Sequence, residues 1–130
     1  AAVVPNICAS SGALTCVLLT YRETGKWSLD STFIGAIAAL VMITPSAGFV
    51  DIGTAFFFGV AWPGICRLEL RIKFSKSAKR LRWVDNGDTF ATHCVGGFVG
   101  AVATGVFARR DVAAYDGITE ILGNVFFDGE

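Results

Sequence analysis

The chain has 130 residues and carries 11 Lys and Arg against 11 Asp and Glu, so its formal net charge is zero with the single His neutral. Hydrophobic residues make up 53% of the chain and charged residues only 17%, whereas a soluble domain carries about 25% charged residues. The high apolar content excludes a disordered tail. Balanced charge argues against a nucleic-acid partner, and 4 Cys are too few for a disulfide-stapled secreted scaffold.

The charged residues avoid four stretches of the chain, at residues 2–20, 31–50, 52–66 and 89–108. A helix needs about 20 apolar residues to cross a bilayer core of about 30 Å. The third stretch is short, and it extends to about residue 70 if Arg67 and Glu69 reach toward the lipid headgroups. A soluble helical bundle is the alternative, and it is disfavoured because soluble helices need a polar face.

The pattern therefore predicts an all-α fold, a polytopic membrane helical bundle with about four transmembrane helices. We expect one partial domain over residues 1–130, with the spans at about 2–20, 31–50, 52–70 and 89–108, a basic loop at about 71–84 and a tail at 109–130. Polar residues within the first span suit a helix that is buried among other helices rather than facing lipid.

Most Lys and Arg residues lie on one side of the predicted bundle. The first connecting segment holds Arg22 and Lys26, and the third holds Arg67, Arg71, Lys73, Lys76, Lys79, Arg80 and Arg82. Because these two segments lie on the same side if the helices alternate, the positive-inside rule places both in the cytoplasm and the N-terminus outside. A nucleic-acid patch at 71–82 is the less favoured alternative, since this run connects two apolar spans.

Small residues and one proline punctuate the spans. Gly96 and Gly100 have the GxxxG spacing that permits close packing of helices in lipid, and Gly35 and Ala39 repeat it in the second span. Pro45 removes a backbone donor, so we expect a kink or an early helix end there. Its neighbours Thr44 and Ser46 could donate to the freed carbonyl.

His93 is the only His of the chain and falls inside the fourth span. An ionisable side chain at membrane depth is costly and usually marks a transport pathway or a proton relay. Regular helical spacing puts His93 on one stripe with Gly97, Gly100 and Thr104. We therefore expect it to face a helix bundle or cavity. The alternative is a packing His that is satisfied by a backbone carbonyl.

The remaining polar and sulfur-containing residues predict structural roles. Asp88 directly precedes the fourth span, where a carboxylate caps a helix N-terminus, and Asp85 lies one turn earlier. The cysteines have no CxxC spacing and are expected to be small buried residues. One His and scattered thiols do not make a metal site, and no nucleophile elbow or catalytic triad is present in the sequence. We expect neither an enzyme nor a cofactor.

Several motifs resemble the Amt/Mep/Rh ammonium transporter family, the fungal Mep-type branch in particular. They are GAIAALVMITPSAGFV at 35–50, DNGDTFATHCVGGFVGAVATGVFA at 85–108, YRETGKWS at 21–28 and AYDGITEILGN at 114–124. The sequence departs from the family pattern at Asn86, where Asp is usual, and at Ala39 and Cys94, where Gly is usual.

The resemblance implies a fold of eleven helices, built as two inverted five-helix repeats plus one, of which this chain corresponds to helices seven to ten. It also implies a homotrimer in the plasma membrane, with a hydrophobic pore for ammonium or ammonia in each subunit and lipid around it. His93 corresponds to the second of the family's two pore histidines, and Thr89 is grouped with it as a pore or substrate contact. The structural residues near the pore would be Asp85, Asp88, Gly96, Gly97, Gly100 and Pro45.

Two other functions remain open on the sequence. The same scaffold could sense ammonium without moving it, and the sequence upstream of residue 1 would separate this alternative from transport. The chain could also be an inert fragment, because the first pore His, the external recruitment site and the paired Phe gate would all precede residue 1.

Overall fold

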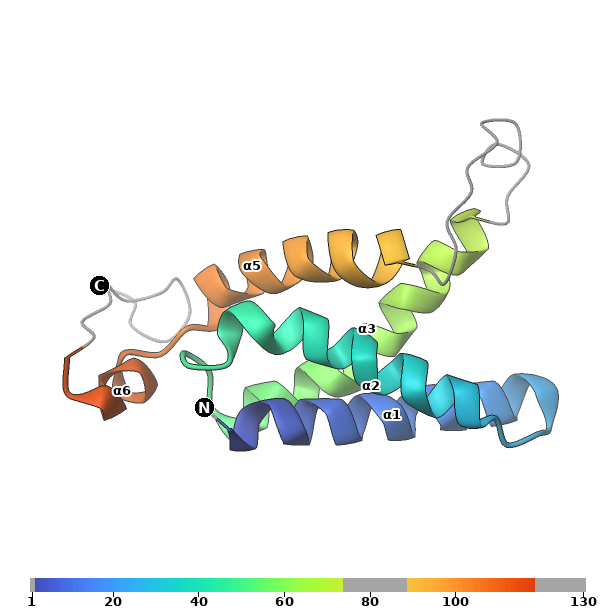
Figure 1. Ribbon diagram of the computed structural model, residues 1–130, viewed down its shortest axis with the longest axis horizontal. Coiled ribbons are helices and arrows are strands. Elements are labelled where there is room, and N and C mark those ends of the chain that lie inside the picture. The colour runs from blue at the N-terminus through green and yellow to red at the C-terminus, as the bar shows by residue number, and fades with distance from the viewer. Residues whose placement is uncertain (1, 74–88, 119–130) are drawn as a thin grey trace.

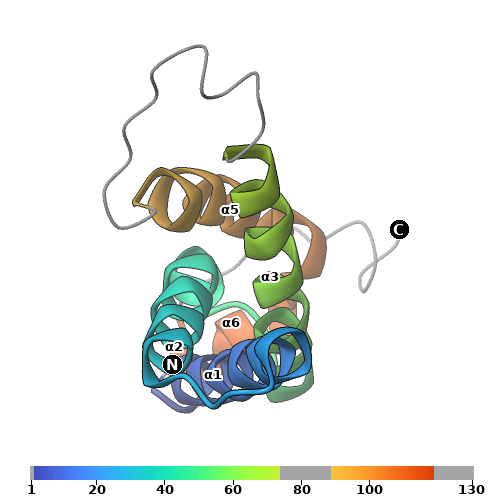
Figure 2. The same cartoon turned by 90° about the vertical axis from the view of Figure 1, so that its right-hand side faces the viewer.

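The computed structural model describes residues 2–73 and 89–118, and every element in these ranges is helical, as the sequence predicts. The elements in chain order are α1 (Val3–Thr24), α2 (Leu29–Ile43), the 3-10 turn η1 (Thr44–Ser46), α3 (Ile52–Lys73), the π-helical segment η3 (Phe90–Val95), α5 (Gly96–Phe107), α6 (Arg110–Ala113) and the 3-10 turn η4 (Ala114–Asp116). Seen along the long axis of the molecule, α1, α2, α3 and α5 surround a common core (Figure 2).

Helices α1 and α2 form an antiparallel hairpin (Figure 1). The turn begins at Gly25, whose φ of 69° is readily adopted only by a residue without a side chain. The Gly25 N–H donates to the Tyr21 carbonyl at 2.8 Å and satisfies part of the exposed helix end. The Ser28 hydroxyl then accepts from the Ser31 N–H and caps α2. Tyr21 stacks on Trp27 across this turn, with ring centroids 4.4 Å apart.

Three glycines lie where α1, α2 and α3 approach one another. A Cβ atom at Gly12 would lie 2.5 Å from the Ala39 Cβ, and one at Gly35 would lie 2.6 Å from the Gly12 carbonyl oxygen. A Cβ at Gly59 would lie 3.1 Å from the Gly12 nitrogen. Such distances leave no room for a side chain, so the three backbones can approach this closely only because these residues are glycines. The close packing predicted at Gly35 and Ala39 is confirmed.

Helix α2 ends at Ile43, directly before the Thr44–Pro45 pair, which confirms the predicted early helix end. The Thr44 N–H donates to both the Leu40 and Val41 carbonyls. In a continuous helix the Val41 carbonyl would accept from the N–H of residue 45, which Pro45 lacks. The Thr44 hydroxyl adds a bond of 2.6 Å to the Leu40 carbonyl. The break is therefore compensated locally, as the bilayer interior requires.

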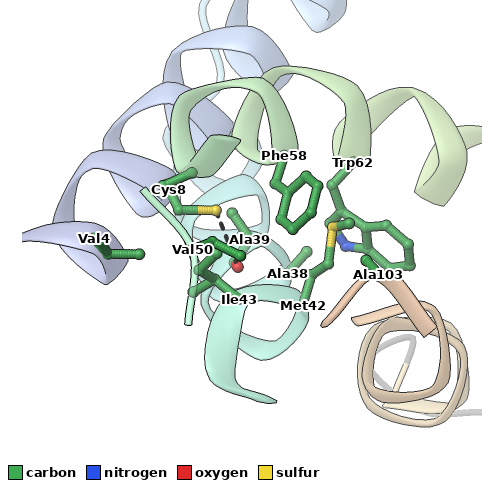
Figure 3. Close-up of a cluster of buried hydrophobic side chains, with 11 residues drawn as sticks. Val4, Cys8, Ala38, Ala39, Met42, Ile43, Val50, Phe58, Trp62 and Ala103 are labelled. Carbon is green, nitrogen blue, oxygen red and sulfur yellow. Dashed lines mark hydrogen bonds between the residues drawn. The ribbon is translucent and has the colours of Figure 1, made fainter. Parts of the chain in front are cut away.

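The core is built around two aromatic side chains of α3. Phe58 and Trp62 are 2% and 0% exposed and extend toward Ala38 and Met42 of α2 and Ala103 of α5 (Figure 3). Helix α3 continues without a break through Pro63, which is also buried. Through these side chains, α5 packs against the same core as α1, α2 and α3.

By length and composition, two helical stretches are apolar enough to cross a membrane, Val3–Thr24 and Leu29–Ser46. Ile52–Ile65 and Thr92–Phe107 are shorter apolar segments. Large apolar side chains are exposed on all four long helices, including Leu14, Phe33, Phe56 and Phe98. A soluble protein of this size rarely exposes so much contiguous apolar surface.

Candidate functional site

The candidate site lies at the start of the helical segment that follows the basic loop. His93 and Thr89 are both exposed, and His93 belongs to the π-helical turn Phe90–Val95. In such a turn the backbone bonds run from residue i to i+5, and π-turns inside α-helices are frequent at functional sites. The π-turn leads directly into α5. The exposed imidazole is therefore carried by the same continuous helical segment as the packed glycines that follow it.

The packed face of α5 is made of small residues. Gly96 lies against the Trp62 indole, where a Cβ would come within 3.0 Å of the Trp62 Cζ2. Gly100 lies against the break in α2, and a Cβ there would collide with the Met42 carbonyl oxygen. Ala103 completes this face and is 8% exposed. The predicted packing role of the Gly96–Gly100 pair is confirmed, because both glycines are buried against other helices.

The predicted stripe is seen only in part in the described residues. Gly100 and Thr104 contact η1, whereas nothing lies within 4 Å of a Cβ built at Gly97, and His93 is exposed. The prediction assumed regular α-helical spacing from His93 to Gly97. The π-turn adds a residue to each hydrogen-bonded ring and changes the angular spacing of the side chains before Gly96. That His93 faces a helix bundle or a cavity stays a prediction.

A partly buried hydroxyl pair connects the break in α2 to α5. The Thr104 hydroxyl donates to the Gly100 carbonyl at 2.8 Å. The Ser46 hydroxyl donates to the Thr104 hydroxyl at 2.7 Å and lies 3.4 Å from the Gly100 carbonyl. The sequence suggested that Ser46 would serve a carbonyl freed by Pro45, but the structure pairs it with another helix. No local pattern could have revealed this, since the two hydroxyls are far apart in the sequence.

The cysteines do not all follow the prediction. Cys8 and Cys16 are buried, and the Cys8 thiol donates to the Ala39 carbonyl at 3.4 Å, but Cys94 is exposed beside His93. Cys94 lies with His93 in the π-turn Phe90–Val95, on the part of the turn that the described residues leave uncovered. Cys66 lies in the helical part of α3 whose side chains are not described.

Neither a metal centre nor the acidic pair is found in the described part of the molecule. Among residues 2–73 and 89–118, no group of three or more His, Cys, Asp and Glu side chains could hold a metal ion. Asp85 and Asp88, which were predicted to stand before the fourth span, lie outside the described residues, as does the basic loop from residue 74 onward. Two further packing residues were not predicted as such from the sequence: Gly12, where α1 meets α2, and Trp62, where α3 meets Gly96 of α5.

The family model described as the Ammonium Transporter Family matches residues 1–128 of the chain. The chain belongs to this family. Among its relatives, the ammonium transporter MEP2 of Saccharomyces cerevisiae is 40% identical over 113 residues, which are 86% of this chain and 22% of that protein. A putative ammonium transporter of Methanothermobacter thermautotrophicus is 37% identical over 108 residues, or 83% of this chain and 26% of that protein.

Solved structures of the ammonium transporter family agree with the fold. The crystal structure of Candida albicans Mep2 superposes with a TM-score of 0.81 at 43% identity, covering 94% of this chain and 26% of that one. The chain thus spans about a quarter of the length of these relatives. Membership of this family implies a multi-pass membrane protein.

Proposed function

We propose that this chain forms one part of a pore that moves ammonium or ammonia across a membrane, within a longer protein, and that His93 lines the pore. The observation that carries the proposal is the exposure of His93 within an apolar helical segment, while Gly96 and Gly100 of the same segment are buried against α2 and α3. An exposed ionisable residue in an apolar helix needs a polar surrounding. A pore completed by the rest of the protein would provide it.

The chemistry of the imidazole suits this guest. Ammonium sheds its hydration shell at a high cost in an apolar pore, so it needs acceptors there. A neutral His offers one acceptor nitrogen and one donor N–H, and it can hold an ammonia-sized molecule and pass a proton. Thr89, exposed four residues before His93, adds a hydroxyl near the same face. Transport of ammonium or ammonia makes and breaks no covalent bond except to a proton, so the proposal includes no enzyme chemistry, cofactor or metal.

The assembly and its orientation are part of the same proposal. The complete protein would be a homotrimer in the plasma membrane, with lipid around it, the N-terminus of this segment outside and the loop at 71–84 in the cytoplasm. The support is the concentration of Lys and Arg in residues 21–30 and 67–82.

The test is His93→Leu in the full-length protein, expressed in a host that lacks its own ammonium transporters. Leu keeps the volume but offers neither acceptor nor donor, so we expect ammonium uptake to be lost or its selectivity over potassium to change, at an unchanged amount of protein in the membrane. Phe98→Leu is the matched control, because Phe98 is a 71% exposed apolar side chain of the same helical segment. It should leave uptake unchanged.

Wild-type uptake and selectivity in His93→Leu would reduce His93 to a packing residue. A wild-type protein that binds ammonium but does not restore uptake would instead favour an ammonium sensor on the same scaffold. Loss of uptake in both His93→Leu and Phe98→Leu would mean that this helix tolerates no change, and would also count against a specific role of the imidazole.

A further inference from the structure

The backbone of α5 comes closest to the rest of the bundle, among its glycines, at the break in α2. A Cβ at Gly100 would meet the Met42 carbonyl oxygen and would lie 3.1 Å from the Pro45 Cγ. At Gly97 and Gly105 of the same helix, by contrast, nothing lies within 4 Å of such an atom. The Met42 carbonyl and the Pro45 ring form a socket for Gly100. This socket is a consequence of the helix break, because Pro45 ends α2 at this place.

The socket is closed by hydroxyl groups in an otherwise apolar interior. Ser46 is 0% exposed, and its hydroxyl donates to the Thr104 hydroxyl at 2.7 Å, while the Thr104 hydroxyl donates to the Gly100 carbonyl at 2.8 Å. Hydrogen bonds of this kind are directional, and in a membrane no water competes for them. They hold one angular position of α5, whereas apolar contacts tolerate sliding and rotation.

The other end of the contact lacks such a constraint. Gly96 rests on the Trp62 ring and the Val41 methyl group, with no polar group among its nearest neighbours. The Trp62 indole N–H is itself buried without a hydrogen-bond partner in the described part of the chain. Packing at Gly96 therefore sets the distance between α5 and α3 but does little to restrain the rotation of α5 about its own axis.

We infer that Ser46 is a positioning residue for His93, acting through its hydroxyl contact with Thr104 and Gly100. Helix α5 continues from the π-turn that carries His93, and Gly100 is about 10 Å from His93 along the axis at 1.5 Å per residue. A rotation of α5 at Gly100 therefore moves the imidazole. This inference rests on the proposed role of His93 in the pore.

The experiment compares Ser46→Ala, Thr104→Val and the double variant in the full-length protein. Each single change removes one hydroxyl of the pair and leaves the volume nearly unchanged. We expect the thermal midpoint of the double variant, measured in detergent, to fall by less than the sum of the two single losses. We expect ammonium uptake per molecule to show a several-fold higher KM and an altered ratio of ammonium to methylammonium uptake. Thr104→Ser keeps the hydroxyl and should stay close to wild type.

Ser31→Ala is the matched control. The Ser31 hydroxyl accepts from the Thr20 hydroxyl at 2.9 Å and so links α1 to α2, away from α5. If the inference is right, this change should lower only the thermal midpoint and leave the KM and the uptake ratio as in wild type. A change of uptake kinetics in Ser31→Ala equal to that in Ser46→Ala would overturn the inference, since any lost interhelical hydroxyl would then have the same effect.

Three further outcomes separate the two proposals. Strictly additive thermal losses of Ser46→Ala and Thr104→Val would overturn the hydroxyl contact. Coupled losses with wild-type KM and uptake ratio in Ser46→Ala, in a wild-type protein that transports ammonium, would overturn the positioning role and leave the proposed function standing. Coupled losses in a wild-type protein that does not transport would overturn the proposed function, and with it the positioning of a pore residue.

Discussion

Gly100 and Gly97 belong to the same helix but meet different surroundings. The backbone of α2 lies against Gly100, because Pro45 ends the regular helix there and brings the Met42 carbonyl and the proline ring to the interface. Gly97 has open space where its side chain would be. Because both residues are glycines inside α5, their helix propensity is the same, and the two positions differ in what surrounds them.

We predict that Gly100→Ala destabilises the full-length protein by about 1–3 kcal/mol, the usual cost of overpacking. The obstacle to its methyl group is backbone, which cannot rotate away as a side chain can. Gly97→Ala serves as the comparison and should be close to neutral or slightly stabilising, because Ala favours the helix. Thermal unfolding in detergent measures both. Equal losses at the two positions would show that the rest of the protein packs on Gly97 as tightly as α2 packs on Gly100.

At the scale of a helix, the start of α3 depends on one carboxylate in the turn after η1. Asp51 directly precedes α3 and accepts from the backbone N–H of Thr54 at 3.3 Å and from the Thr54 hydroxyl. The Thr54 hydroxyl is the main reason that the pKa of Asp51 lies below its ordinary value of 3.8. The Thr54 and Gly53 amides and the positive charge of Arg109 act in the same direction, while partial burial opposes them.

This cap predicts a pH dependence with a definite sign. A carboxylate whose pKa is lowered by folding stabilises the folded state above its unfolded pKa, and this contribution disappears as the pH falls through the folded pKa. We expect Asp51→Ala to lower stability at neutral pH by about 0.5–2 kcal/mol, the cost of a lost N-cap. The loss should shrink as the pH falls below the ordinary aspartate pKa of 3.8 and on through the lower pKa of folded Asp51.

Asp51→Asn is the control for this prediction, because Asn keeps an acceptor oxygen at the cap but does not titrate. Thermal midpoints of the full-length protein over the acidic range should therefore be flatter for Asp51→Asn than for the wild type. A difference between Asp51→Ala and wild type that stays constant down to the lowest pH would contradict a role of the ionised carboxylate.

For the whole molecule, the orientation in the membrane follows from charge. We predict that Lys76→Cys, in a full-length protein without other reactive cysteines, reacts with a membrane-impermeant thiol reagent only from the cytoplasmic side. Gly48→Cys is the matched control, since Gly48 is exposed in the turn between η1 and α3 and nothing lies within 4 Å of a Cβ there. It should react only from outside. Labelling of Lys76→Cys in intact cells would contradict the proposed orientation.

Local chemistry was sufficient for much of this molecule. Membrane helices need long charge-free stretches, so the absence of Asp, Glu, Lys and Arg from 2–20, 31–50 and 89–108 predicts helices there without knowledge of their partners. The end of α2 at Pro45 could be predicted because the missing N–H and the ring of a proline act on its own helix, although α3 continues through Pro63. The motifs at 35–50 and 85–108 also indicated the family correctly, since they are local runs of residues.

Tertiary structure decided the face that each residue of the fourth span presents. The π-turn at Phe90–Val95 exposes His93 and Cys94 and leaves Gly96 and Gly100, rather than Gly97, against the neighbouring helices. Regular helical spacing cannot anticipate a shift of register that depends on how α5 fits Trp62 and the break in α2. The pairing of Ser46 with Thr104 has the same origin, because a hydroxyl finds its partner only when two distant helices are brought together. Sequence periodicity describes a helix in isolation, whereas its rotation is determined by the surface on which it packs.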